Sequence, residues 1–451
     1  MIHILELLSA LSRYYFVFLL ACFIFVGYHF LRGEQTGNLR TAKAIIALFA
    51  IFAFAIVAGD MQGLFFAFGV LGLTIFGSMA LRLTYTALCP LLTNIVMFKL
   101  MLGLVMLWRL DTGLAWRQLV FAALGLFVSL LIPFVFKIFK NFERLEKLYF
   151  VVCIGLLGLV SIAAALANVV DIPLVAIDQF GSARWLNIAG ITFQPSEFAA
   201  IAFVLFLAAS LREKPSITRL TFISIATASL ILILVMQRNL GGALLFFVVF
   251  MIMMYASTGS KVLFLAGFGA MSVASVAAYH IFAHVRVRVA AFIDPWADIA
   301  QGGFQITQSM FAIATWGPFG AGLGRGLPER IPVVERDVIF SAISEEFGWV
   351  FGLLLLALYI LFLLRGLQLA RRAIKPIHAM LALGFTSFLV FQAFVSIGGN
   401  VRFMPMTGIT LPFVSYGGTS VFVCLLMLGV LNWLNGQMDE HPYIPETEIH
   451  D

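Results

Sequence analysis

Long runs of apolar residues, separated by short polar segments, fill most of this chain. A helix needs about 20 apolar residues to cross the hydrocarbon core of a bilayer. Thirteen runs approach or reach that length, at 14–31, 43–59, 63–80, 87–108, 117–136, 148–169, 195–211, 219–236, 239–256, 262–283, 341–364, 378–398 and 412–434. They are apolar on nearly every side, which is typical of helices in lipid, where backbone groups pair only within the helix. The pattern predicts an all-α polytopic membrane protein.

The composition supports this interpretation. Of the 451 residues, 62% are hydrophobic and only 11% are charged, whereas soluble domains carry about twice that charged fraction. Disordered chains are excluded too, because they are poor in apolar residues and rich in charge. The net charge of +6 comes without a cluster of Lys and Arg among aromatic residues, so no nucleic-acid partner is indicated.

The basic residues between the runs indicate an orientation. Every Lys outside the apolar runs lies in one set of alternate loops, while the opposite set contains Arg but no Lys. The positive-inside rule then predicts that the N-terminus lies outside the membrane and the C-terminus in the cytoplasm. The segments 170–194 and 284–340 would face outward. They are longer than the other loops and contain Trp and Phe, so we expect them to be ordered at the interface and to carry the chemistry.

Metal or disulfide chemistry has little support in the sequence. The four cysteines lie within apolar runs, and the seven histidines form no recognised ligand pattern. Disulfides and metal sites require paired spacing and polar surroundings. The cysteines are therefore interpreted as free thiols in the core.

Several charged residues enter the apolar runs, where each one is costly. Lys99 lies in the middle of the fourth run, so we expect a buried partner for it, with Glu197 as one candidate. Glu197, Glu345 and Glu346 can be explained as acids at helix ends or at the interface, where the helix dipole favours a carboxylate. From its position alone, Asp337 is predicted to be a helix N-cap, a position that Asp favours.

Two further patterns lie in the second long segment. Arg286 and Arg288, two residues apart just after a predicted helix, suit lipid headgroups or a phosphate. The glycine-rich stretch 320–326 resembles a phosphate loop only superficially, because it lacks the Lys-Ser/Thr ending. We interpret it as a flexible outer loop.

Taken together, these residues resemble the SEDS family (RodA, FtsW and SpoVE), membrane glycosyltransferases that polymerise peptidoglycan. Four spaced blocks carry the resemblance over roughly residues 87–436. They are Arg184-Trp185-Leu186 with Gln194-Pro195-Ser196-Glu197; Arg286-Val287-Arg288-Val289 with Asp294-Pro295 and Gln308-Ser309; Asp337-Val338-Ile339-Phe340 with Glu345-Glu346-Phe347-Gly348; and Leu411-Pro412 with Ser415-Tyr416-Gly417-Gly418.

The resemblance implies a ten-helix core over 87–436, with its large outer loop at 284–340, in the bacterial cytoplasmic (inner) membrane. Residues 1–86 then form an extension with about three additional transmembrane helices, and 437–451 form a cytoplasmic tail. An odd number of added helices places the N-terminus outside, as the charge pattern does.

The resemblance also implies a reaction. Its substrate would be lipid II, a disaccharide-pentapeptide on polyprenyl pyrophosphate, and Asp337 would act as the general base. The implied substrate-binding residues are Arg184, Trp185, Gln194, Ser196, Glu197, Arg286, Arg288, Gln308, Ser309, Glu346, Ser415 and Tyr416. A divalent cation, Mg²⁺ or Mn²⁺, would be held by Glu197 and Asp337, and no organic cofactor is expected. The implied partner is a class B penicillin-binding protein, a transpeptidase that crosslinks the new strands.

The sequence departs from the family pattern at several positions. Ala200 stands where a Lys is usual, Asn239 replaces an Asp, Ser396 replaces an Asn, and Glu335-Arg336 replace His-Thr before Asp337. Lys99 is a candidate substitute for the Lys missing at position 200.

These departures leave two rival interpretations open. Buried charges and many helices also suit a lipid II flippase, although no internal repeat typical of transporters is evident. An inactive scaffold of a cell-wall synthesis complex is the second alternative. The sequence does not discriminate among roles in elongation, division and sporulation.

Overall fold

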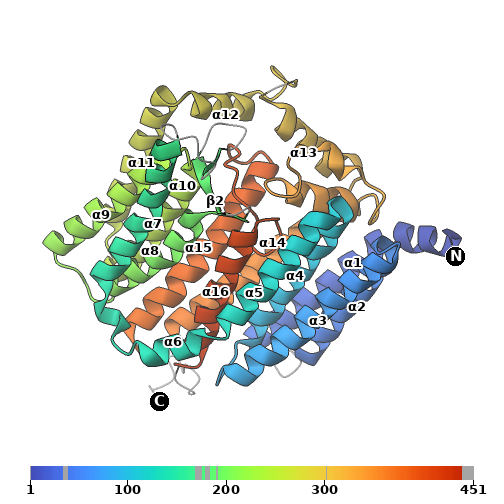
Figure 1. The fold of residues 1–451 in the computed structure, drawn as a ribbon, viewed down its shortest axis with the longest axis horizontal. Helices are drawn as coiled ribbons and strands as arrows, with labels where there is room; N and C mark the ends of the chain where they lie inside the picture. The colour runs from blue at the N-terminus through green and yellow to red at the C-terminus, as the bar shows by residue number, and fades with distance from the viewer. Residues whose placement is uncertain are drawn as a thin grey trace, which may run out of the picture.

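A computed structural model describes residues 2–33, 39–167, 175–177, 183–188, 191–300 and 302–438. Helices α1 (Ile2–Leu31), α2 (Leu39–Val57) and α3 (Met61–Thr84) come first and pack along one side of the bundle (Figure 1). The middle part of the chain forms α4 (Pro90–Leu110), α5 (Thr112–Ser129), α6 (Ile132–Ile138), α7 (Glu146–Ala167), α8 (Pro195–Leu211), α9 (Ile217–Met236), α10 (Leu240–Thr258) and α11 (Lys261–Ile281), with the 3-10 turn η1 (Phe142–Arg144) after α6. The last three long helices are α14 (Ile339–Arg371), α15 (Pro376–Asn400) and α16 (Gly418–Asn435).

The predicted apolar runs are confirmed as helices. Within the described residues, twelve helical spans are long and apolar enough to cross a membrane, with α5 and α6 together forming one of them. The remaining predicted run, 195–211, forms α8, which has only 17 residues. The last run begins later than predicted, because residues 412–417 form a turn before α16.

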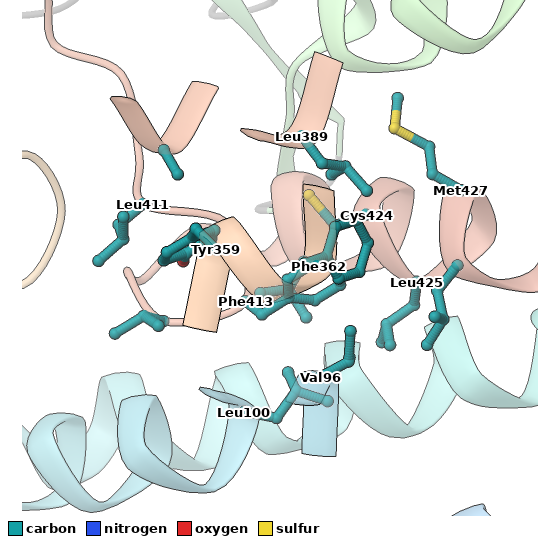
Figure 2. Close-up of a cluster of buried hydrophobic side chains, with 14 of the residues drawn as sticks. Val96, Leu100, Tyr359, Phe362, Leu389, Leu411, Phe413, Cys424, Leu425 and Met427 are labelled. Atoms are coloured by element: carbon teal, nitrogen blue, oxygen red, sulfur yellow. The ribbon is translucent and has the colours of Figure 1, made fainter. Parts of the chain in front are cut away.

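Helix α4 forms the centre of the bundle, and all of its residues from Leu91 to Trp108 are buried. Lys99, on this helix, is fully buried. Its ammonium lies 4.0 Å from the ring centre of Tyr359, 4.8 Å from that of Phe362 and 4.7 Å from that of Phe413. Figure 2 shows these three rings in one cluster above α4.

The buried partner expected for Lys99 is therefore a set of aromatic faces, which attract a cation through the ring quadrupole. Within the described residues, Lys99 forms no ion pair with Glu197 or another carboxylate.

The N-terminal helices are joined to the rest of the chain by hydrogen bonds as well as by packing. Ser9 Oγ donates to the carbonyl of Leu323 at 2.7 Å, and Ser12 Oγ accepts from the Leu323 amide at 2.8 Å. The amides of Gly322 and Gly324 donate to the carbonyl and the carboxylate of Glu346. The glycine-rich stretch 320–326 is thus held between α1 and α14, rather than being the flexible loop predicted from its composition.

The two long outer segments contain secondary structure that the sequence pattern did not predict. Figure 1 shows α12 (Ala283–Ile293), α13 (Phe304–Thr315) and β2 (Ala183–Ile188) at one end of the bundle. Strand β2 pairs antiparallel with β1 (Val175–Ile177) and β3 (Ile191–Phe193), with Ala176 opposite Trp185 and Phe193 opposite Leu186. A 3-10 turn, η2 (Pro328–Arg330), precedes α14. Apart from this small sheet, the described parts of the chain fold into helices and their connections.

Candidate active site

A cavity of about 1220 Å³ opens at the end of the bundle that carries α12 and β2. Residues from the outer segments, from the ends of α5, α8, α10, α12 and α15, and from the turn before α16 line it. The sequence-predicted residues on its wall are Trp185, Gln194, Ser196, Glu197, Arg288, Asp337 and Tyr416. The fold thus brings residues from all four motif blocks to one space.

Asp337 lines the cavity just before α14. The N-cap of α14 is Val338, and no side chain caps that helix end, so the cap role that position alone suggested for Asp337 is wrong. The backbone of Asp337 is anchored at both polar groups: its amide donates to the Val333 carbonyl at 3.3 Å, and its carbonyl accepts from Asn400 Nδ2 at 2.9 Å. The backbone of Asp337 is therefore held in place at the cavity wall.

Arg288 and Asp337 converge on Gly408. A Cβ atom at Gly408 would lie 3.3 Å from Asp337 Oδ2 and 3.7 Å from Arg288 Nη2. Gly408 has φ of +70°, which glycine tolerates far better than other residues. Arg288 Nη1 also donates to the Met406 carbonyl at 2.7 Å, so the segment that contains Gly408 holds the guanidinium.

The start of α8 forms another part of the wall. Pro195 occupies the first turn and Glu197 is the acidic residue of that turn, as the sequence predicted. Glu197 therefore lies at the positive end of the helix dipole and on the cavity wall. Gln194 Nε2 donates to Ser196 Oγ at 2.9 Å, and Asn239 Nδ2 donates to the same oxygen at 3.4 Å. Asn239, which replaces the Asp of the family pattern, also caps α10 by accepting from the Gly242 amide.

A third part of the wall contains a cation between two aromatic rings. Cζ of Arg336 lies 6.0 Å from the ring centre of Trp185 and 5.5 Å from that of Tyr416. The amide of Tyr416 donates to the Glu335 carbonyl at 2.7 Å, which joins the turn before α16 to the segment that carries Asp337. Sequence reasoning noted Arg336 as a departure but did not place it in the site.

Comparison with known proteins agrees with this arrangement. The family model for FtsW, RodA and SpoVE, described as cell cycle proteins, matches residues 80–439. The chain belongs to this family.

Relatives of known name cover most of the chain. The peptidoglycan glycosyltransferase RodA of Mycobacterium tuberculosis is 32% identical over 428 residues, covering 87% of this chain and 89% of its own. The probable peptidoglycan glycosyltransferase FtsW of Geobacter sp. strain M18 is 33% identical over 272 residues, covering 58% of this chain and 74% of its own.

Two solved structures share the fold. A chain of a peptidoglycan synthase complex, studied for how it coordinates polymerization and crosslinking, aligns with TM-score 0.66 at 27% identity, covering 78% of this chain and 98% of its own. The rod shape determining protein RodA of Thermus thermophilus aligns with TM-score 0.55 at 25% identity, covering 76% of this chain and 95% of its own. With twelve candidate spans and this family membership, the chain is a multi-pass protein of the bacterial inner membrane.

Not all of the predicted residues of this FtsW/RodA/SpoVE member line the cavity. The residues that lie elsewhere are Arg286, Gln308, Ser309, Glu346 and Ser415. Arg286 is on α12, not just outside a helix as predicted, and donates to the His280 carbonyl. Ser415 accepts from the Leu411 amide and so closes the turn before α16. The side chain of Arg184 lies outside the described part of the structure.

Glu346 has a structural position. Its side chain is fully buried, its Oε1 lies 3.3 Å from Arg109 Nε, and its Oε2 accepts from the Gly324 amide at 3.2 Å. Glu345 accepts from the Leu327 amide at 2.8 Å. Both carboxylates thus hold the segment that follows α13.

Ser309 is linked to Asp337 through other residues. Its hydroxyl shares a hydrogen bond with Ser341, and Ser341 Oγ donates to Asn400 Oδ1 at 3.0 Å. Asn400, which lines the cavity, donates in turn to the Asp337 carbonyl. Sequence reasoning missed Asn400, although its place at the end of an apolar run, where a buried amide needs partners, was an available signal.

A divalent cation fits the cavity only with help from a substrate. In the described part of the chain, no three His, Cys, Asp or Glu side chains gather closely enough to hold an ion. Mg²⁺ is commonly bound by one or two carboxylates together with substrate phosphates. Glu197 and Asp337 both lie on the cavity wall and would be the carboxylates that hold such an ion together with a bound pyrophosphate.

Proposed function

We propose that this chain is a peptidoglycan glycosyltransferase that polymerises lipid II on the outer face of the cytoplasmic membrane. The named relatives are peptidoglycan glycosyltransferases. The observation that carries the proposal is that Asp337 and Arg288 both reach Gly408 on the wall of a large cavity. A carboxylate beside a cation is what the transfer of a sugar from a pyrophosphate requires.

The reaction uses these two groups for different purposes. The 4-hydroxyl of the acceptor sugar attacks the anomeric carbon of the donor, and the bond from that carbon to the pyrophosphate oxygen breaks. Asp337 takes the hydroxyl proton as general base, an effect of about 10²–10⁴-fold. A single displacement with one base inverts the anomeric centre and needs no covalent intermediate. Arg288 neutralises charge on the departing pyrophosphate.

The other wall residues bind and orient the substrate. Gln194, Ser196 and Asn239 present amide and hydroxyl groups already linked by hydrogen bonds, which suits the many hydroxyl and amide groups of a disaccharide. Glu197 and Asp337 would hold Mg²⁺ or Mn²⁺ together with the pyrophosphate, and such an ion supplies Lewis-acid stabilisation of the leaving group.

The proposed partner is a class B penicillin-binding protein. The support is the solved neighbour, which is a chain of a peptidoglycan synthase complex that coordinates polymerization and crosslinking.

The decisive experiment is polymerisation of labelled lipid II by the purified chain in detergent. Wild-type protein is expected to make glycan strands, and Asp337→Asn is expected to make none while retaining its yield and melting temperature. Asp60→Asn is a matched control, because Asp60 caps α3, does not line the cavity, and Asn caps equally well. A wild-type chain that moves lipid II across vesicles but makes no strands would be a flippase, and inactivity in both assays would indicate a scaffold.

A further inference from the structure

We infer that Arg336, held between Trp185 and Tyr416, is a substrate-binding residue that forms an oxyanion subsite beside Asp337. The ligand group is a phosphate or carboxylate oxygen of the lipid-linked substrate. This inference rests on the proposed function, since it names a contact within the same cavity.

The position of the guanidinium carries the first step of the argument. Arg336 lies on the cavity wall together with both aromatic residues, and its side chain is 45% exposed. The two rings come from β2 and from the turn before α16, which are far apart in the sequence. Two ring faces hold a planar cation by cation–π attraction without using its N–H groups.

The hydrogen-bonding state of the guanidinium carries the second step. Among the described residues, its N–H groups donate no hydrogen bond to the protein, and its nearest carboxylate oxygen, on Glu335, is 3.9 Å from Nε. That separation exceeds hydrogen-bond length. An arginine has five N–H donors in a fixed fork that matches the oxygens of a carboxylate or phosphate. Here two aromatic rings flank the fork while its donors face a space that a ligand can enter.

The neighbouring arginine on the wall makes a useful contrast. Arg288 donates to the Met406 carbonyl and approaches Asp337 near Gly408. Arg336 precedes Asp337 in the chain and reaches toward Trp185 and Tyr416 instead. The base is therefore flanked by cations on different elements, which allows two anionic groups to be bound around one reacting hydroxyl.

The experiment measures kcat and KM for lipid II with Arg336→Gln. We expect KM to rise at least tenfold, with kcat within threefold of wild type, because binding is lost while the base stays in place. Arg336→Lys keeps the charge but loses the planar fork, and should give an intermediate KM. Arg330→Gln is the matched control, an exposed arginine of the same segment that does not line the cavity.

A second substrate distinguishes the two sources of the oxyanion. Lipid-linked disaccharide pyrophosphate without its peptide stem lacks the peptide carboxylates. If the pyrophosphate is the ligand, Arg336→Gln raises KM equally for both substrates. If a peptide carboxylate is the ligand, the variant raises KM only for the substrate that carries the peptide.

Binding is also measured without turnover, by fluorescence titration of lipid II onto Asp337→Asn and onto Asp337→Asn with Arg336→Gln. The inference predicts at least tenfold weaker binding by the double variant. KM and affinity within twofold of the parent for both substrates would overturn the inference while leaving the proposed function intact. Failure of the wild-type chain to bind lipid II would overturn the proposed function and, with it, the inference. If Arg336→Gln does not fold, the same thresholds apply to Arg336→Lys, whose unchanged KM and affinity would overturn the inference.

Discussion

The ammonium of Lys99 lies 4.7 Å from the centre of the Phe413 ring, and Phe413 has a φ of 68°. A bulky residue seldom adopts positive φ, and such a conformation persists only when its surroundings enforce it. Lys99 on α4 thus contacts the turn that leads to Tyr416 on the cavity wall.

This relationship predicts the effect of Lys99→Met. Burying an ammonium costs several kcal/mol, whereas Met fills a similar volume and contacts aromatic rings favourably. We expect an unchanged or higher melting temperature. We also expect at least a tenfold loss of polymerisation, because the turn bearing Tyr416 loses its electrostatic hold. Thermal unfolding and strand synthesis are measured on the same preparation.

The control for that variant is Lys43→Met, which removes a lysine of α2 that donates to Ser78 and has no contact with the turn. Its polymerisation should equal that of the wild type. Full activity of Lys99→Met would show that the turn holds its shape without the cation.

A second prediction concerns Asn400, whose side chain is buried and joins Ser341 to the backbone of Asp337. Asn400→Ala removes the hydrogen bonds to Ser341 and to the Asp337 carbonyl, at a cost of about 1–3 kcal/mol of unfolding free energy. Because the backbone of the base is no longer anchored, kcat should fall at least tenfold with KM within threefold. Steady-state kinetics measure kcat and KM separately, and thermal unfolding measures the loss of stability.

The matched control is Asn432→Ala. Asn432 is equally buried, but it accepts from the Cys89 amide away from the cavity. The Asn432→Ala variant should lose about as much unfolding free energy as Asn400→Ala and keep the wild-type kcat per folded molecule. Equal kcat for the two alanine variants would contradict a positioning role for Asn400.

A third prediction concerns Arg109 and Glu346, which pair across α4 and α14 at 3.3 Å. Arg109→Met leaves a fully buried carboxylate uncompensated, a change that costs about 3–5 kcal/mol. The lower end applies here, because the Arg109 side chain is 22% exposed. Glu346→Gln should cost less, since Gln can still accept from the Gly324 amide.

A double-mutant cycle measured by thermal unfolding tests this pair. The double variant Arg109→Met with Glu346→Gln should be more stable than Arg109→Met alone. Strictly additive losses in the cycle would mean that the two charges do not interact.

The helices were predictable because an apolar run in lipid can satisfy its backbone hydrogen bonds only by forming a helix. The family blocks likewise pointed to Asp337, Arg288 and Glu197, which the fold brings to one cavity. Helices α12 and α13 were missed because they are short and lie in the outer segments, where no membrane imposes a long apolar run.

Residue roles were less predictable than elements, because they depend on contacts between distant parts of the chain. Glu346 lies in a family block, yet its partners are Arg109 and the glycine-rich stretch. Lys99 was expected to have a buried partner, with Glu197 as one candidate, but the fold surrounds it with rings from α14 and from the turn before α16. Arg336 departs from the family pattern, and only the fold brings Trp185 and Tyr416 to either side of it.

The shortness of α8 has a consequence for how a lipid-linked substrate arrives. Its 17 residues extend about 25 Å, less than the roughly 30 Å of hydrocarbon in a bilayer. If Arg212, which follows its last residue, lies at one interface, the first turn of α8 ends short of the other interface. Glu197 and Ser196 would then lie below the level of the headgroups, where a pyrophosphate could reach them sideways while its polyprenyl chain stays among the acyl chains.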